Sequence, residues 1–132
     1  CNILTDLADT KIEYPFLSLN MMGPYIDRNL KLAKALIKSM SESIRALQTD
    51  ATNAKIAIRA ALKTDDVETI DYALSRSVRV LDPRPFPTVA GIQTVLDEIG
   101  KEAKGKTIKF DEFVDMRALR ELEKEGFFKQ QR

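Results

Sequence analysis

The 132-residue sequence contains no histidine, no tryptophan and a single cysteine, Cys1. Without histidine the chain lacks the commonest general base, the commonest metal ligand and the side chain that titrates near neutral pH. One cysteine cannot form an internal disulfide or a thiolate metal cage, so cysteine usage does not indicate a redox compartment. These absences exclude a serine–histidine triad within the chain, and the sequence predicts no metal site, no cofactor and no enzyme activity.

The net charge and the length of the apolar runs exclude further classes of function. The 21 Lys and Arg residues nearly balance the 20 Asp and Glu residues, so the net charge is +1. A nearly neutral chain has no global attraction to nucleic acid or to an anionic membrane, and no nucleic-acid partner is predicted. No apolar run reaches the ~18 residues of a membrane-spanning helix. The first residues do not have the pattern of a secretory signal. Apolar residues follow Cys1 directly, which disfavours a lipid-bearing cysteine with its polar tether.

What is present fits one globular domain, with 44% hydrophobic and 31% charged residues. Its first 23 residues have no helical pattern. Ile3 to Leu7 is a short apolar run with Asp6 and Asp9 near its end, which is typical of a strand or strand remnant. Pro15 blocks a regular helix, so an extended connection is expected to follow. The apolar side chains of this connection need a cover; they are Phe16, Leu17, Leu19, Met21 and Met22.

Residues 24–132 have the pattern of about five helices. The clearest is a long helix that begins at Pro24, and its apolar residues recur at alternating steps of four and three: Ile26, Leu30, Ala33, Ile37, Met40, Ile44 and Leu47. This spacing allows two interpretations, a core helix of a globular domain and the seam of a coiled coil. We favour the core helix, because Ala33 and Met40 are weak seam residues and no other segment keeps the heptad.

The other helices are predicted from their capping residues. Asp50 is expected to cap a second helix, which runs to about Thr64. The third helix is expected to be capped by Asp65 or Asp66, the fourth by Thr88 and the last by Asp115. Asp82 to Pro87 holds three prolines in five residues and predicts a stiff linker, and Gly105 and Gly126 are expected helix ends. The residues expected to point inward are Ala54, Ile58, Ala61 and Leu62; Val67, Ile70, Leu74, Val78 and Leu81; Val89, Ile92, Leu96, Ile99 and Ala103; and Met116, Leu119 and Leu122.

Two groups of charged residues allow a functional interpretation. Basic residues recur at helical spacing on the first two helices: Lys31, Lys34, Lys38, Arg45, Lys55, Arg59 and Lys63. A phosphate-contacting surface is one interpretation, but the near-zero net charge and the lack of interleaved aromatic residues favour a solvated face opposite the core. The acidic pairs Asp6–Asp9 and Asp65–Asp66 are expected to form a turn and a helix cap rather than a catalytic pair.

Taken in order, these segments resemble the C-terminal part of the substrate-binding proteins of ABC importers for nitrate, sulfonates and taurine, and of the related thiamine-pyrimidine binders. One departure is Arg28-Asn29, where many relatives have Asn-Pro before the long helix. The resemblance is carried by ILTDLAD (Ile3 to Asp9); a Tyr-Pro loop and a Met-Met segment leading into YIDRNLKLAKALIKSMSESI (Tyr25 to Ile44); the turn of Asp65, Asp66 and Glu68; Tyr72 before DPRPFP; and DMRALRELEKEGFF (Asp115 to Phe128).

The resemblance implies that the chain is the last third of a two-lobed α/β binding protein with the type II periplasmic fold. Residues 1–23 would be the strand and loop that cross back from the second lobe, and 24–132 one helical C-terminal unit. The implied location is periplasmic, or extracytoplasmic and membrane-tethered, with the secretory signal encoded upstream. The implied partners are an ABC permease and a small-molecule ligand bound together with the missing part. Thr5, Asp6 and Tyr14 lie near the inferred cleft and are the candidate ligand-binding residues.

The alternative is a helical interaction module that binds no ligand and dimerises through the heptad face from Ile26 to Leu47. The two hypotheses differ in what they leave exposed. A fragment of a larger protein should expose apolar residues that face the absent lobe, and the isolated chain should form homo-oligomers or exchange segments to cover them. A compact monomer with all of them buried would count against the fragment; they include Phe16, Leu17, Met21, Met22, Phe127 and Phe128.

Overall fold

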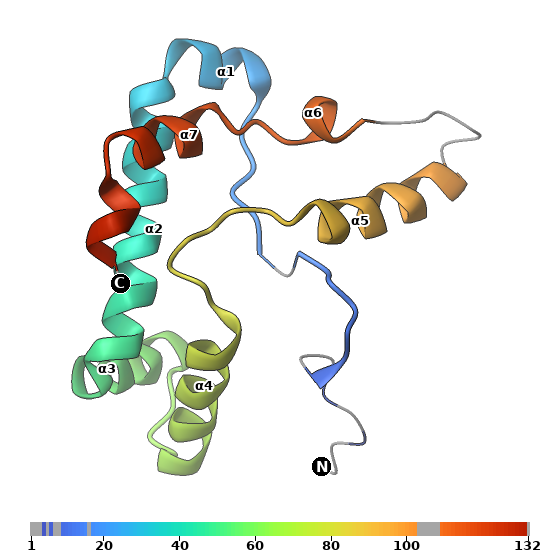
Figure 1. The fold of residues 1–132 in the computed structure, drawn as a ribbon. Helices are drawn as coiled ribbons and strands as arrows, with labels where there is room; N and C mark the ends of the chain where they lie inside the picture. Colours follow the sequence, from blue (N-terminus) through green and yellow to red (C-terminus); the bar gives the residue numbers. More distant parts are fainter. Residues whose placement is uncertain (1–3, 5, 7–8, 16, 103–108, 132) are drawn as a thin grey trace.

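The computed structural model of the chain describes residues 4, 6, 9–15, 17–102 and 109–131. Helices dominate this part of the chain, and none of its residues lies in a strand, so the mainly helical class is confirmed (Figure 1). Most of the strand predicted at Ile3–Leu7 falls outside the described residues, and Leu4 and Asp6 have no regular structure. The elements are α1 (Gly23–Arg28), α2 (Leu30–Thr49), α3 (Ala51–Leu62), α4 (Val67–Val80), α5 (Val89–Glu102), α6 (Phe110–Phe113), α7 (Arg117–Lys124) and the 3-10 helix η2 (Phe127–Gln131).

Three helices begin at the predicted capping side chains. In each case a side-chain oxygen accepts a hydrogen bond of 3.1 Å from the amide three residues later: Asp50 before α3, Asp66 before α4 and Thr88 before α5. Each bond satisfies one of the amides that helix geometry leaves without a partner, which is why these residue types mark helix starts. Of the two aspartates considered for α4, Asp66 is the cap.

The last helix differs in detail from its prediction. Met116 occupies the N-cap position of α7, and Asp115 lies one residue earlier, where its carboxylate accepts the Arg117 amide at 3.0 Å. Gly126 follows α7 with φ of 78°, a left-handed conformation that favours glycine, so the predicted helix end is confirmed. The short helix α6 and the 3-10 turn η2 were not predicted. The predictions for Ala103 and Gly105 lie outside the described residues.

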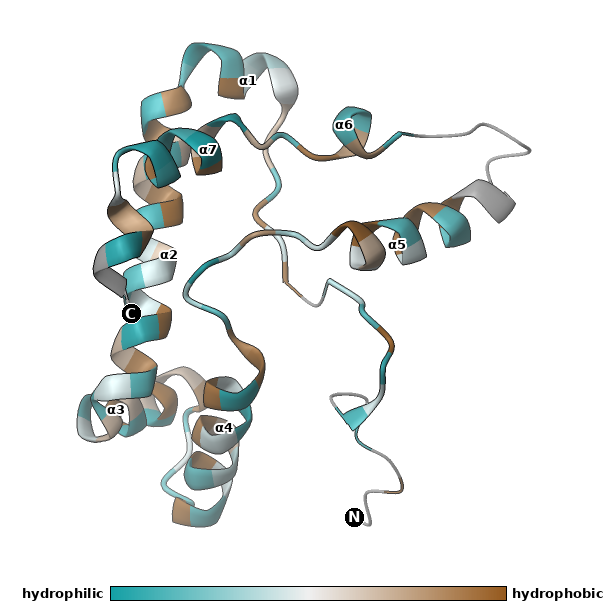
Figure 2. Cartoon of the chain, viewed as in Figure 1, coloured by the Kyte–Doolittle hydropathy of each residue, from teal (hydrophilic) through white to brown (hydrophobic). Residues whose placement is uncertain are grey.

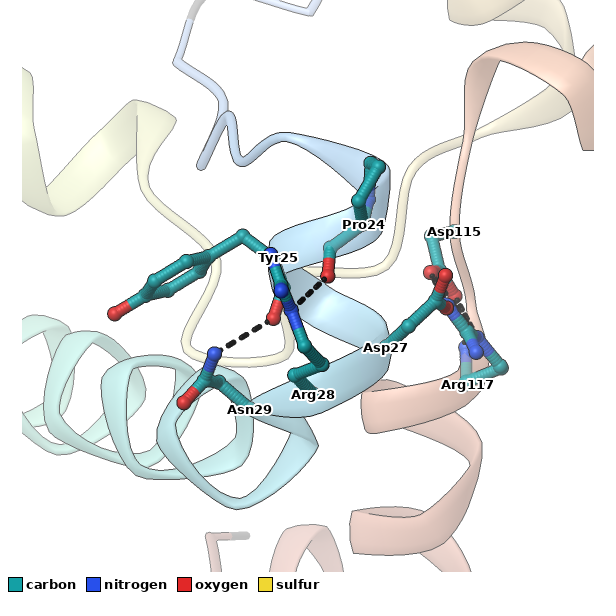
Figure 3. Close-up of polar contacts among 7 residues, drawn as sticks. All are labelled: Pro24, Tyr25, Asp27, Arg28, Asn29, Asp115 and Arg117. Carbon is teal, nitrogen blue, oxygen red and sulfur yellow. Dashed lines mark hydrogen bonds and ion pairs between the residues drawn. The ribbon is translucent and has the colours of Figure 1, made fainter.

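The predicted long helix is broken at Asn29, which is a correction to the sequence interpretation. Asn29 has φ of −133° and ψ of 37°, and its amide donates to the Ile26 carbonyl at 3.0 Å in place of the helical partner. Its side-chain amide instead donates to the Tyr25 carbonyl at 2.9 Å, while Arg28 Nε donates to the Pro24 carbonyl at 3.1 Å (Figure 3). Short polar side chains compete with the backbone for carbonyl groups, and here this competition ends α1.

The main core lies where α7 and η2 run along α2. Leu122 of α7 is fully buried and Ala33 and Ile37 of α2 face it, so this half of the heptad face is covered within the chain. Around this core, the Lys34 ammonium of α2 is paired with Glu121 at 3.0 Å and with Glu125. The buried members of the core are Ala33, Ile37, Ala118, Leu119, Leu122 and Phe128.

A second buried group lies on α2, α3 and α4, which pack against one another, and a third on α5. The buried side chains are Ile44, Ala54, Ile70 and Leu74 in the second group, and Ile92 and Leu96 in the third. Five predicted inward positions are wrong, because each apolar stripe is wider than the surface that covers it. These five side chains are exposed: Ala61, Leu62, Val67, Val78 and Val89.

The proline-rich linker from Asp82 to Pro87 is fixed to α2 and η2. Gln48 Nε2 of α2 donates to the Leu81 carbonyl at 2.9 Å, and the hydroxyl of Ser41, which is fully buried, donates to the Pro83 carbonyl. Phe86 then packs edge to face against Phe128 with ring centroids 5.2 Å apart. The predicted extended path is wrong in its first half, because the chain bends at Pro83 and Arg84 and the Phe86 amide donates to the Arg84 carbonyl at 2.7 Å. The position of the linker is set by side chains that the sequence pattern did not identify.

The fold leaves a large surface exposed. The accessible area is 10289 Å² for a chain of 14.9 kDa, whereas a compact monomer of this mass is expected to expose ~7,000 Å². Figure 1 shows the reason, since α5, α6 and the N-terminal segment extend to one side of α2, α3, α4 and α7. Figure 2 shows hydrophobic residues on the segment before α1 and on the first turn of α5. Leu17 and Met22 are 69% and 77% exposed, while Phe128 is buried.

Candidate functional site

The most concentrated polar contact of the N-terminal segment is an ionic cluster of Asp6, Asp9, Arg76 and Arg79. Both arginines belong to α4 and are three residues apart, so they lie on the same face of the helix. The two aspartates are also three residues apart, and the Asp9 amide donates to the Asp6 carbonyl at 3.0 Å, which makes the predicted turn. The ionic cluster therefore joins two short motifs of matching spacing from distant parts of the chain.

The geometry within the ionic cluster is that of two guanidinium groups converging on one carboxylate. Arg76 binds both oxygens of Asp6, with Nη2 2.8 Å from Oδ1 and Nη1 bonded to Oδ2. Arg79 Nη1 lies 3.4 Å from the same Oδ2, and Arg79 Nη2 is paired with Asp9. The hydrogen bond to Asp6 raises the pKa of Arg76, so the guanidinium stays charged. Bidentate pairs of this kind fix orientation as well as charge.

The three candidate ligand-binding residues lie in different surroundings. Thr5 is outside the described residues. Asp6 is partly buried, and its carboxylate is taken up by the arginines of α4. Tyr14 is 55% exposed and lies in the extended connection, just before Pro15, which packs near Gly91 of α5. The structure therefore assigns Asp6 to an internal ion pair and leaves Tyr14 as the exposed one of the two described candidates.

Sequence reasoning missed the role of Arg76 and Arg79. The sequence does contain a pattern that is compatible with these ion pairs, because an Asp-x-x-Asp turn and an Arg-x-x-Arg helix face have complementary charge and spacing. Nothing in one sequence, however, says that positions about 70 residues apart meet. The contact follows from the fold of α2, α3 and α4, which brings the last two turns of α4 next to the N-terminal segment.

A second feature is a shallow groove of about 260 Å³ between α3 and α4. Ile56, Val67 and Ile70 line it, and two ion pairs stand at its rim, Lys55 with Asp71 at 2.6 Å and Arg59 with Asp65. The groove is smaller than the ~300–1,000 Å³ typical of small-molecule sites, and its lining carries no nucleophile or convergent polar set. We assign no chemistry to it.

Four of the seven basic residues named on the first two long helices pair with acids of neighbouring segments. Lys34 and Lys38 of α2 face Glu125, the residue just after α7, and Lys38 also lies 5.3 Å from the ring centroid of Phe127. Their counterparts on α3 form the two pairs at the rim of the groove. This arrangement is that of the ion-paired solvated face that the charge balance favoured over a phosphate-contacting surface.

A further cluster joins α1 to α7. Arg117 lies between two carboxylates, with Nη2 2.7 Å from Asp27 and 2.6 Å from Asp115, and these bonds raise the pKa of Arg117 (Figure 3). The side chains of Arg117 and Asp27 are 52% and 58% exposed and that of Asp115 is 29% exposed, so the cluster lies at the surface and orients α1 against α7. Among the described residues, no group of three potential metal ligands occurs, and none of the described helices is long and apolar enough to cross a membrane.

Comparisons of the chain with protein-family models, with curated proteins and with solved structures return no match. The functional assignment therefore rests on the residues and on the geometry described above.

Proposed function

We propose that this chain is the C-terminal part of a solute-binding protein of an ABC importer, of the type that serves nitrate, sulfonates and taurine. In such a protein the chain would complete a two-lobed α/β fold, bind a small molecule between the lobes and deliver it to a membrane permease outside the cytoplasm. Its mechanism would be closure of the lobes around the ligand, without a chemical step. The ordered set of motifs from Ile3 to Phe128 supports this proposal.

One structural observation carries the proposal furthest, which is the surplus of exposed surface. The chain exposes roughly 3,000 Å² more than a compact monomer of its mass. Much of its exposed apolar area lies on the segment before α1, where Leu4, Ile12, Leu17 and Met22 are 64–96% exposed. A part of a larger protein has such a surface where the remainder of the fold would pack, because apolar side chains exposed side by side are costly in water.

The alternative, a helical interaction module, has less surface available than the heptad pattern suggested. Ala33, Ile37 and Ile44 of the heptad face are buried within the chain. Leu32 and Leu36 beside this face are 42% and 40% exposed, which leaves a narrow apolar strip on α2. A narrow strip of two leucines supports a helix–helix contact less well than the full predicted seam would have done.

The coding sequence immediately upstream of Cys1 tests the proposed function directly. We expect an open reading frame that continues upstream in the same frame and encodes a secretory signal and an α/β lobe. That full-length protein should bind a small anionic or heterocyclic ligand in isothermal titration calorimetry, and substitution of Tyr14 by alanine should weaken the binding if this side chain lines the cleft. An in-frame stop codon followed by a start site for this chain would overturn the proposal.

A further inference from the structure

The N-terminal segment, defined here as the described residues from 4 to 22, is held to α4 by charge. The ionic cluster supplies the ion pairs between them, with Asp6 and Asp9 on the segment and Arg76 and Arg79 on the helix. Two described apolar side chains near these aspartates are open to solvent, since Leu4 is 96% exposed and Ile12 64% exposed. Burial of these two side chains therefore contributes little to holding the segment.

A contact of this kind opens easily. Ion pairs near the surface gain little net free energy in water, and added salt screens them. When the ionic cluster opens, the carboxylates and the guanidinium groups lose their partners at the same time. Both sets are then ready to accept a new partner with the same charges and the same three-residue spacing.

The connection beyond the ionic cluster allows the segment to reach elsewhere. The described residues 11–15 and 17–22 contain no helix, and Pro15 disfavours a helix around it. Because the two halves of the ionic cluster are about 70 residues apart in sequence, the bonds themselves do not depend on both halves belonging to one chain. A second copy of the chain carries an identical segment and an identical α4, so it offers the same contacts.

We propose that two copies of this chain exchange their N-terminal segments, so that Asp6 and Asp9 of each copy pair with Arg76 and Arg79 of the other. Exchange keeps every bond of the ionic cluster, which is the general reason that segment swapping is an accessible route to a dimer. It also brings the exposed apolar residues of the segment between two chains. The surplus of roughly 3,000 Å² per chain exceeds the ~800 Å² that each partner buries in a standard interface.

This inference goes beyond the proposed function and does not depend on it, because it uses only contacts among described residues of this chain. The upstream sequence could contradict the proposed function and leave the exchange unaffected. Conversely, a strictly monomeric chain would overturn the exchange, whereas the upstream coding sequence decides the proposed function separately.

The test uses two variants with opposite charge reversals. The first variant carries Asp6→Arg and Asp9→Arg, and the second carries Arg76→Asp and Arg79→Asp. Each variant has four like charges in its own ionic cluster and in its own homodimer. When the two variants are mixed, only an exchanged heterodimer restores both clusters, since each segment then meets the opposite charge. The matched control combines all four substitutions in one chain, which restores the cluster within each copy and between copies.

Native mass spectrometry reports the result, because the two variants differ in mass. We expect the wild-type chain and the four-substitution control to form dimers whose fraction rises with concentration. Each two-substitution variant alone should be monomeric, and the mixture should give a one-to-one heterodimer. Trypsin cleavage after Lys11 should be several-fold faster in the Arg76→Asp and Arg79→Asp variant alone, which gains no new trypsin site, than in the same chain within the mixture. A wild-type chain that stays monomeric at every concentration, or variants that dimerise equally alone and mixed, would overturn the proposal.

Discussion

Replacement of Ser41 by alanine tests whether the bond between α2 and the proline-rich linker stabilises the fold. The Ser41 side chain is fully buried, and its hydroxyl donates to the Pro83 carbonyl. Alanine leaves this partly buried carbonyl without its donor, and an unsatisfied buried acceptor costs ~1–3 kcal/mol. Alanine also has a higher helix propensity than serine by ~0.5 kcal/mol, which acts in the opposite direction. The expected net loss in the free energy of unfolding is therefore ~0.5–2.5 kcal/mol.

Ser43 provides the matched control on the same helix. Its side chain is exposed, and its hydroxyl donates to the Ser39 carbonyl at 2.7 Å within α2 itself. Ser43→Ala therefore gains helix propensity without leaving a buried acceptor unpaired. The difference between the two variants removes the propensity effect and should amount to ~1–3 kcal/mol.

Urea unfolding followed by far-UV circular dichroism measures this difference, with stability taken from the midpoints at an unchanged slope. Hydrogen exchange gives a local reading, because the Arg84 and Phe86 amides of the linker should exchange faster in Ser41→Ala than in Ser43→Ala. If the two variants had equal stabilities and equal linker exchange, the Ser41–Pro83 bond would not anchor the linker and our reasoning would be refuted.

Three further outcomes are expected. Leu122→Ala should lower the free energy of unfolding by ~2–5 kcal/mol in the same urea assay, because Leu122 is fully buried in the main core. Gly91→Ala should speed amide exchange in the first turn of α5, because the new Cβ would lie 2.8 Å from Thr88 Oγ1 and displace the cap. The hydroxyl and amide of Thr69 hold the pKa of Asp66 below its usual 3.8. The stabilisation that this cap gives α4 is therefore complete above the pKa of Asp66 in the unfolded chain. It is lost as the pH falls through the lower pKa of Asp66 in the folded chain, and measuring the free energy of unfolding against pH tests this.

Each of these outcomes has a control in the chain. Leu62→Ala removes the same atoms from a side chain that is 51% exposed, and it should cost much less than Leu122→Ala. Gly23→Ala adds a Cβ that meets nothing within 4 Å, so α5 exchange should stay unchanged. Asp66→Asn should make the loss of stability at acid pH smaller than it is in the wild-type chain. Equal effects within any pair would contradict the corresponding contact.

The local features of the fold could be predicted from the sequence because short-range chemistry determines them. Aspartate and threonine cap helices when they precede a periodic apolar run, as Asp50, Asp66 and Thr88 do. Gly126 follows α7 because a left-handed residue is needed there. The break at Asn29 could also be explained locally, but a continuous heptad pattern concealed it.

Burial and the candidate site depended on which surfaces meet, and periodicity does not contain that information. Val67 and Leu62 lie on apolar stripes but are exposed, because no described element covers that side of α3 and α4. Ser41 shows the opposite case, a polar side chain that is buried although it does not belong to the apolar stripe. It is buried because its hydroxyl donates to the Pro83 carbonyl of the linker. The partners of Asp6 on α4 could not be foreseen for the same reason, as only the folded chain brings them together.

The anchored linker has a mechanical consequence. Because three of its residues are prolines, it has few torsions that can absorb movement, and α2 holds it at the Leu81 and Pro83 carbonyls. Helix α2 is 20 residues long, which corresponds to a rod of ~30 Å. When α2 tilts, the stiff linker therefore changes the direction of the start of α5, because few of its torsions can absorb the movement. A body that packs on α5 would therefore change direction with α2, even though α3, α4 and the linker separate the two helices along the chain.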